Sequence, residues 1–145
     1  MRLLISACLL GEPCRYDGAA KPLSDAQMET LLRDHTLIPV CPEQLGGLPT
    51  PRTPSERSGD RVVMRDGRDV TAEFARGAAV VRALALETGA EAALLKARSP
   101  SCGSGEIYDG TFTGARTSGD GVTTEALRAL GIPVYSEENF PFAAE

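Results

Sequence analysis

Residues 2–8 read Arg-Leu-Leu-Ile-Ser-Ala-Cys, a short apolar run that ends in a cysteine. Similar apolar runs follow at Leu37–Val40, Ala92–Ala97 and Ile132–Tyr135. Short continuous runs of this kind are typical of parallel strands that are buried on both faces. We therefore predict four strands, the first of them at Arg2–Ala7.

Helical patterns separate the predicted strands. The predicted helices, each with the residue that opens it, are Asp25–Asp34 (Ser24), Ala72–Thr88 (Thr71) and Val122–Leu130 (Gly121). Gly89 and Gly131 stand where helices are expected to end. Strands that alternate with helices imply right-handed crossovers and an open, mostly parallel sheet with helices on both faces. We predict one Rossmann-like α/β domain over residues 1–145, with its strands in the order 2-1-3-4.

The stretch from Gly46 to Asp69 interrupts this alternation. It is rich in proline, glycine and charged residues, and it suggests a hairpin through Arg61–Met64 with a turn at Asp66-Gly67. We expect it to form an irregular insertion that lies over one edge of the sheet.

Composition argues against several classes of function. The chain has 15 basic and 20 acidic residues, a net charge of −5, and no block of like charges, so a nucleic-acid partner is not expected. The chain has no Trp and few other aromatic residues, which leaves no platform for stacking on single-stranded RNA. We expect a small polar substrate, and the sequence leaves a homo-oligomer open.

The N-terminal string Ser6-Ala7-Cys8 superficially resembles a lipoprotein cleavage site. Only Leu3 to Ile5 precede it, whereas a secretory signal needs about 7–15 apolar residues at this place. No other segment approaches the ~18 apolar residues of a membrane span. We expect a cytoplasmic protein, whose cysteines are reduced, ligating or catalytic rather than bridged.

Three of the four cysteines follow predicted strands. Cys8 follows the first strand, Cys41 the second, and Cys102 lies shortly beyond the third. The carboxyl ends of parallel strands meet at one edge, where open α/β sheets bind ligands. The only histidine, His35, is expected at the opposite edge. Three convergent thiolates can hold Zn²⁺ or an iron–sulfur cluster, and scattered free cysteines are the remaining alternative.

The fourth cysteine, Cys14, lies in a predicted loop six residues after Cys8, so a four-cysteine site stays open. Glycine and proline around the cysteines let backbone N–H groups approach a cluster closely. The Asp17-Gly18 and Asp109-Gly110 pairs are either plain turns or parts of the site.

Taken together, the loop motifs resemble those of a known family. The motifs are SACLLG at 6–11, RYDG at 15–18, CPE at 41–43, GGL at 46–48, PR at 51–52, SPSCG at 99–103 and YDGTF at 108–112. The chain is similar to the thiouracil desulfidase family, long catalogued as a domain of unknown function. The resemblance runs from Ser6 to about Glu138.

The resemblance implies a [4Fe–4S] cluster held by three cysteines, which match Cys8, Cys41 and Cys102, with one iron left open. Cys14 is then dispensable as a ligand. The implied enzyme activity is non-redox, hydrolytic removal of sulfur, as hydrosulfide, from a thiolated pyrimidine such as 2-thiouracil or a thiouridine. The open iron acts as a Lewis acid on the thiocarbonyl group.

Water needs a base in such a reaction, and Glu43, two residues after Cys41, is the candidate. The resemblance points to the same position, and the alternative is an exposed carboxylate at a strand end. Ser101 is the candidate for orienting water or substrate, and the alternative is a turn hydroxyl that bonds its own backbone. Lys96 either contacts substrate or pairs with an acidic loop residue.

Arg15, Tyr16 and Asp17 are candidate substrate contacts, because Tyr16 can stack on a pyrimidine while Asp17 meets its amide-like edge. Arg52 is a weaker candidate, since we expect it to pair with Glu56.

Two other functions compete with desulfuration. One is a non-catalytic module that binds zinc or an iron–sulfur cluster, or senses metal or redox state. The other is sulfur insertion into transfer RNA, which the acidic charge balance disfavours.

Overall fold

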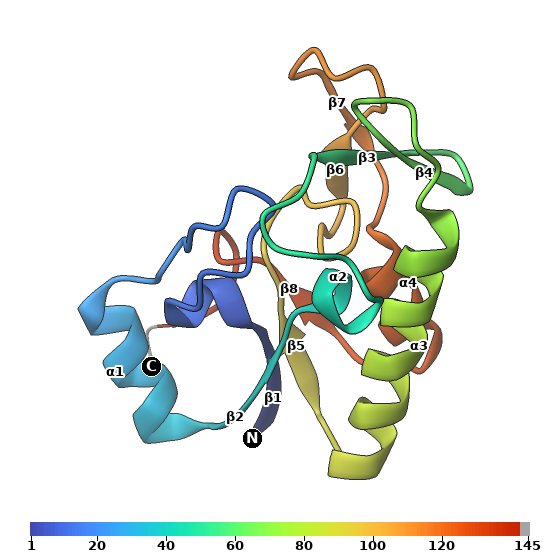
Figure 1. The fold of residues 1–145 in the computed structure, drawn as a ribbon. Helices are drawn as coiled ribbons and strands as arrows, with labels where there is room; N and C mark the ends of the chain where they lie inside the picture. The colour runs from blue at the N-terminus through green and yellow to red at the C-terminus, as the bar shows by residue number, and fades with distance from the viewer. Residues whose placement is uncertain (143–145) are drawn as a thin grey trace.

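The computed structural model describes residues 1–142, and Figure 1 shows their fold. The strands are β1 (Arg2–Ser6), β2 (Thr36–Val40), β3 (Ser55–Ser58), β4 (Arg61–Met64), β5 (Ala92–Leu94), β6 (Glu106–Tyr108), β7 (Arg116–Ser118) and β8 (Val134–Tyr135). The α-helices are α1 (Asp25–Asp34), α2 (Pro42–Leu45), α3 (Thr71–Thr88) and α4 (Val122–Ala129).

Four parallel strands form the central sheet in the order β2-β1-β5-β8. Counted along the chain, this is the predicted order 2-1-3-4. The register places Leu3 of β1 between Leu37 of β2 and Ala92 of β5. Leu3, Leu4 and Ile5 are fully buried, as expected for a strand covered on both faces.

Helices cover both faces of this sheet, as predicted (Figure 1). Since side chains alternate along a strand, Leu3 and Ile5 pack on the face that also buries Leu31 of α1. Leu4 packs on the other face, in the cluster that contains Val81 of α3 and Leu127 of α4.

The helix ends follow the predicted signals. Ser24 caps α1 by accepting a hydrogen bond from the backbone N–H of Gln27, and the Gln27 side chain accepts one from Ser24 in return. Gly89 ends α3 with a φ of 68°, in the left-handed region that favours glycine.

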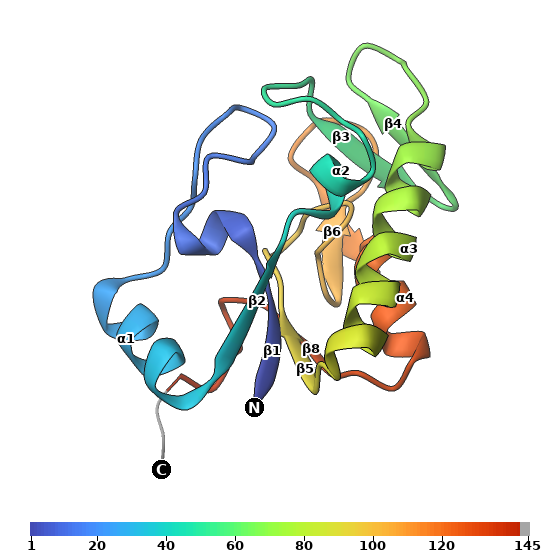
Figure 2. The ribbon, with the colours of Figure 1, turned by 60° about the horizontal axis from the view of Figure 1, so that its bottom comes forward.

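Two antiparallel hairpins, β3–β4 and β6–β7, lie beyond the carboxyl ends of the sheet strands (Figures 1 and 2). The insertion at 46–69 is therefore more ordered than predicted, since it contains the β3–β4 hairpin. The expected hairpin strand at Arg61–Met64 is present as β4, and Gly67 takes a φ of 93° in the turn that follows it.

Within residues 1–142, no helix combines the length and the apolar character that crossing a bilayer requires.

Candidate active site

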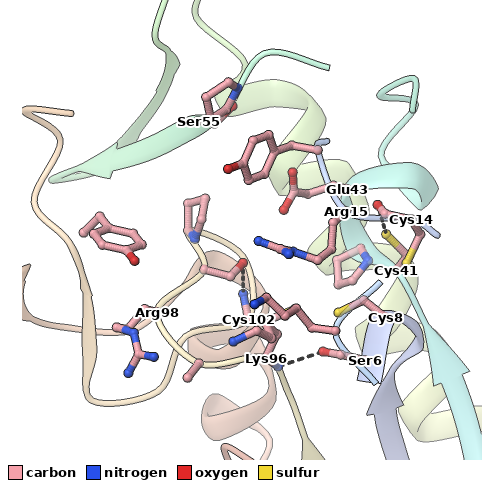
Figure 3. A pocket seen from close by; sticks show the side chains of 18 of the residues that line it. Ser6, Cys8, Cys14, Arg15, Cys41, Glu43, Ser55, Lys96, Arg98 and Cys102 are labelled. Atoms are coloured by element: carbon pink, nitrogen blue, oxygen red, sulfur yellow. Dashed lines mark hydrogen bonds between the residues drawn. The ribbon is translucent and has the colours of Figure 1, made fainter. Parts of the chain in front are cut away.

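A cavity of about 530 Å³ opens at the carboxyl ends of the central strands. Cys8, Cys14, Cys41 and Cys102 all line it, so the structure brings together the three cysteines that topology predicts and adds the fourth. Figure 3 shows Cys8, Cys14 and Cys41 near one another at one end of this cavity. His35 lies just before β2, where Met1 and Phe140 contact it, and this is the opposite edge of the sheet, as predicted.

Each of the three cysteines that follow strands is placed by a tight connection. Cys8 lies in a single 3₁₀ turn, Ala7–Leu10, directly after β1. Cys41 separates β2 from α2 and is the N-cap residue of that short helix. Cys102 lies in the turn after β5, where its backbone N–H donates to Ser99 Oγ at 3.0 Å.

Cys14 is buried and contacts Cys41. The Cys41 thiol donates a hydrogen bond to the backbone carbonyl of Cys14, with 3.7 Å between Sγ and oxygen. Burial and this contact raise the pKa of the Cys14 thiol to about 12. The fourth cysteine is therefore part of the thiol cluster and not a remote loop residue.

Burial and, to a smaller extent, the nearby Cys41 raise the pKa of Cys8 to about 11, while Lys96 and Arg15 act in the opposite direction. Burial likewise raises the pKa of Cys102. Thiolates crowded together and removed from water repel one another. These cysteines are therefore stable together as thiolates only when a strongly positive group lies among them.

The donor set fits an iron–sulfur cluster. All four sulfur donors line a single cavity, and Cys thiolates are the ligands that such clusters use. Among residues 1–142, no three His, Cys, Asp or Glu side chains are grouped so that they could share one metal ion. Ligands of a cluster bind different iron atoms and lie farther apart than ligands of a single ion. The four thiols of the cavity therefore have the donor chemistry that an iron–sulfur cluster requires.

Glu43 lines the same cavity from the first turn of α2. Arg52 Nε donates to Glu43 Oε1 at 3.0 Å, and the Arg52 side chain is only 3% exposed. Burial raises the pKa of the Glu43 carboxyl, while Arg52 acts in the opposite direction. The predicted candidate base is thus a cavity carboxylate held by a buried guanidinium, and not an exposed strand end.

The predicted pair between Arg52 and Glu56 is wrong. Arg52 instead pairs with Glu43, and its Nη2 also donates a hydrogen bond to the backbone carbonyl of Cys14 at 3.0 Å. Glu56 accepts two backbone N–H groups of a distant loop. Spacing of four residues brings side chains together on a helix, but Arg52 lies in an irregular loop and Glu56 in strand β3.

Two glycines allow α2 to lie directly against α3. A Cβ added to Gly46 would fall 2.0 Å from the backbone oxygen of Glu73, and one added to Gly77 would fall 2.0 Å from that of Pro42. Arg76 of α3 also donates to the carbonyl of Gly46 at 2.9 Å. This backbone contact fixes α2 at the cavity, and with it the position of Glu43.

The remaining predicted site residues are divided between the cavity and its surroundings. Arg15 and Tyr16 line the cavity, with the Arg15 guanidinium 5.7 Å from the centre of the Tyr16 ring. Asp17 is exposed, lies 3.7 Å from Arg15, accepts the backbone N–H of Ala19, and is not among the described residues that line the cavity.

Ser101 is not brought to the cavity. Its side chain is buried, and its hydroxyl lies 2.8 Å from that of Thr123 on α4. Ser99 lines the cavity instead, and its hydroxyl accepts the backbone N–H groups of Ser101 and Cys102. The sequence signal for Ser99 is the Ser-Pro pair at the start of the turn, because a serine there can accept the N–H groups that follow.

Lys96 lines the cavity and pairs with Glu137. Pairing with an acidic loop residue is one of the two alternatives predicted for Lys96. Glu137 also accepts the backbone N–H of Ala97 at 2.8 Å, and Ser6 Oγ accepts that of Lys96 at 2.9 Å (Figure 3). Sequence reasoning missed Glu137 and Ser6 as support for this side of the cavity.

Comparison with known proteins gives a family and a solved structure of the same fold. The "Uncharacterized protein YbbK" of Bacillus subtilis (strain 168) is 41% identical over 145 residues, covering 93% of this chain and 95% of its own. A solved structure named "[4Fe-4S]-dependent thiouracil desulfidase TudS" is 50% identical, with a TM-score of 0.92 over 97% of this chain and 93% of its own. Residues 3–139 match the model of the family described as 2-thiouracil desulfurase, and this chain therefore belongs to that family.

Proposed function

We propose that this protein is an enzyme that removes sulfur from a small thiolated pyrimidine by hydrolysis and releases it as hydrosulfide. The observation that carries the proposal is a single cavity lined by four cysteine thiols and a partly buried carboxylate, Glu43. The name of the similar solved structure, a thiouracil desulfidase, supports the same substrate class.

Cys8, Cys41 and Cys102 are the proposed ligands of a [4Fe–4S] cluster, since each directly follows a strand of the rigid sheet or its turn. When bound, the cluster supplies an iron without a protein ligand, which acts as a Lewis acid on the thiocarbonyl sulfur. Cys14 stays outside the ligand set and packs beside Cys41. Lys96 and Arg15 line the cavity and contribute positive charge near Cys8.

Glu43 is the proposed general base. Its Oε1 is held by Arg52, whereas its Oε2 has no hydrogen-bond partner among the described residues, so this oxygen can accept a proton from water. Water adds to the carbon that carries sulfur, and the carbon–sulfur bond then breaks with both electrons leaving on sulfur. The products are a carbonyl group and hydrosulfide, with no net oxidation or reduction.

Tyr16 and Arg15 are proposed substrate contacts at the mouth of the cavity. Tyr16 is partly exposed beside the cavity, and its ring offers a flat apolar face to a pyrimidine. Arg15 donates hydrogen bonds and can meet a ring carbonyl.

The test is anaerobic reconstitution with iron and sulfide, followed by reaction with 2-thiouracil or a thiouridine in water labelled with heavy oxygen. We expect hydrosulfide and carbonyl product in equal amounts, label in the new carbonyl group, and no need for an added oxidant or reductant. The preferred substrate of the two identifies whether base or nucleoside is recognised.

Two outcomes would contradict the proposal. A protein that incorporates iron and sulfide but releases no hydrosulfide from either compound is a binding module and not an enzyme. A carbonyl product without label, or a reaction that depends on an added redox partner, would exclude the hydrolytic route.

A further inference from the structure

The side of the cavity away from the β2 and β1 strand ends is built by the two hairpins and carries no cysteine. We call this part the outer wall: Ser55, Glu56, Arg65, Tyr108 and Phe112. Ser55 and Glu56 come from β3, Arg65 directly follows β4, and the other two come from β6 and the loop that follows it. In Figure 3 the labelled Ser55 lies well apart from Cys8 and Cys41.

Glu56 is a buried carboxylate that joins the two hairpins. It is 8% exposed, and its Oε1 accepts the backbone N–H of Gly110 at 2.9 Å and that of Phe112 at 3.1 Å. A buried charge of this kind is costly unless hydrogen bonds compensate it. A Cβ added to Gly110 would lie 2.9 Å from Cβ of Ser58, so the loop is pressed against β3 at this point.

Phe112 has an unusual backbone conformation at this contact. Its φ is 58°, and the other non-glycine residue with positive φ in residues 1–142, Arg98 at 65°, lines the same cavity. Such strain persists only where the surrounding structure fixes it, and it concentrates at ligand sites. The Arg65 guanidinium lies 5.6 Å from the centre of the Phe112 ring.

We propose that Glu56 is a positioning residue that holds Phe112 in the outer wall, where its ring packs against the planar ring of the substrate. Glu56 fixes the backbone on both sides of Thr111 and thereby fixes the direction of the Phe112 side chain. A planar heteroaromatic ring gains most from such a rigid aromatic partner. This inference rests on the proposed function, because it assigns the ring-binding part of the same cavity.

The experiment measures equilibrium dissociation constants of the reconstituted protein for uracil and, under conditions that slow turnover, for 2-thiouracil. The variants are Glu56→Ala, Glu56→Gln and Phe112→Leu. The matched control is Asp66→Ala, which removes another carboxylate that accepts a backbone N–H, that of Arg68, in the turn after β4, and which is not among the residues that line the cavity.

We expect Glu56→Ala and Phe112→Leu to weaken binding of both compounds by about the same factor, on the order of tenfold, or ~1.4 kcal/mol. Uracil lacks the sulfur, so an equal effect on both ligands assigns the loss to the ring. Glu56→Gln keeps an acceptor oxygen and should restore binding to within about threefold. KM should rise while kcat changes little, since the cysteine end is untouched.

Unchanged affinity in Glu56→Ala, or an equal loss in Asp66→Ala, would overturn this inference. So would a fall in kcat and melting temperature without a change in affinity. If uracil binds as expected but no hydrosulfide is released from 2-thiouracil, the proposed function fails and the ring contact stands. If hydrosulfide is released and Glu56→Ala binds normally, only the ring contact fails.

Discussion

The two sides of the cavity are built from different kinds of structure. The inner end, formed by the four cysteines and Glu43, lies on the connections at the carboxyl ends of parallel strands packed between helices. The outer wall lies on two short antiparallel hairpins whose strands have three or four residues. A rigid inner end suits chemistry that needs fixed donors, whereas hairpin loops can vary in sequence without disturbing the sheet.

The largest expected effect comes from replacing a proposed cluster ligand at the inner end of the cavity. Replacing a proposed ligand, in Cys102→Ala, should abolish cluster incorporation and reduce hydrosulfide release to background, because three ligands are needed to hold the cluster. Cys14→Ala is the matched control and should retain iron. Iron and sulfide content per chain after reconstitution measures both. Equal loss of iron in Cys14→Ala would mean that all four cysteines hold the cluster.

The second-largest effect is expected from replacing Glu43, also at the inner end. Glu43→Gln keeps the shape of the side chain but removes the proposed base, so kcat should fall by about 10²–10⁴-fold. Iron content should stay close to that of the wild type, whereas the melting temperature should fall, because Arg52, whose side chain is 3% exposed, loses its charged partner. A variant with the full rate of hydrosulfide release would show that another group accepts the proton.

A smaller effect concerns the ion pair between Arg52 and Glu43. Arg52→Gln leaves a carboxylate that is 18% exposed without its guanidinium, and we expect the free energy of unfolding to fall by about 3 kcal/mol. Chemical denaturation measures this loss. The double variant with Glu43→Gln should be less destabilised than the sum of the two single variants, because no unpaired charge remains. Strict additivity would mean that the pair contributes nothing as a pair.

The smallest effect concerns Asp69, which lies between β4 and α3 and pairs with Arg61 of the β3–β4 hairpin. The backbone N–H and the hydroxyl of Thr71, together with Arg61, lower the pKa of Asp69 from 3.8 to about 2. A carboxyl whose pKa is lower in the folded state stabilises the fold above its unfolded value and loses this contribution as pH falls toward 2. The melting temperature of Asp69→Asn should therefore be lower than that of the wild type near neutral pH, and the two should converge near pH 2.

The iron-free protein is the appropriate sample for this pH series, because metal–thiolate binding is itself pH-dependent. Glu106→Gln is a useful comparison, since Glu106 pairs with Arg116 on the surface of the other hairpin. A constant difference between wild type and Asp69→Asn down to pH 2 would contradict the assignment.

The same contrast explains what the sequence could predict. Cys8, Cys41 and Cys102 follow strands, so the topology of a parallel sheet places them at one edge without knowledge of any side-chain contact. Glu43 could be predicted as a site residue because it lies two residues after Cys41. Ser101 does not line the cavity, because neighbouring residues in an irregular turn point in different directions, and Ser99 lines it instead.

Apart from the strand at Arg61–Met64, the outer wall could not be predicted, because its strands are short and are stabilised by contacts that are distant in sequence. The hydrogen bond between Glu56 and Gly110 joins residues 54 positions apart, and no local sequence pattern predicts it. For the same reason the partner of Arg52 could not be identified from spacing alone.

The glycine contact between α2 and α3 has a consequence for protein engineering. Replacing a glycine inside a helix by alanine is a common way to gain about 0.5–1 kcal/mol of stability, and Gly77 lies inside α3. Here the added methyl group would collide with the backbone of Pro42 and displace the segment that carries Cys41 and Glu43. A thermostabilised library should therefore keep Gly46 and Gly77 fixed as a pair, although neither touches the cavity.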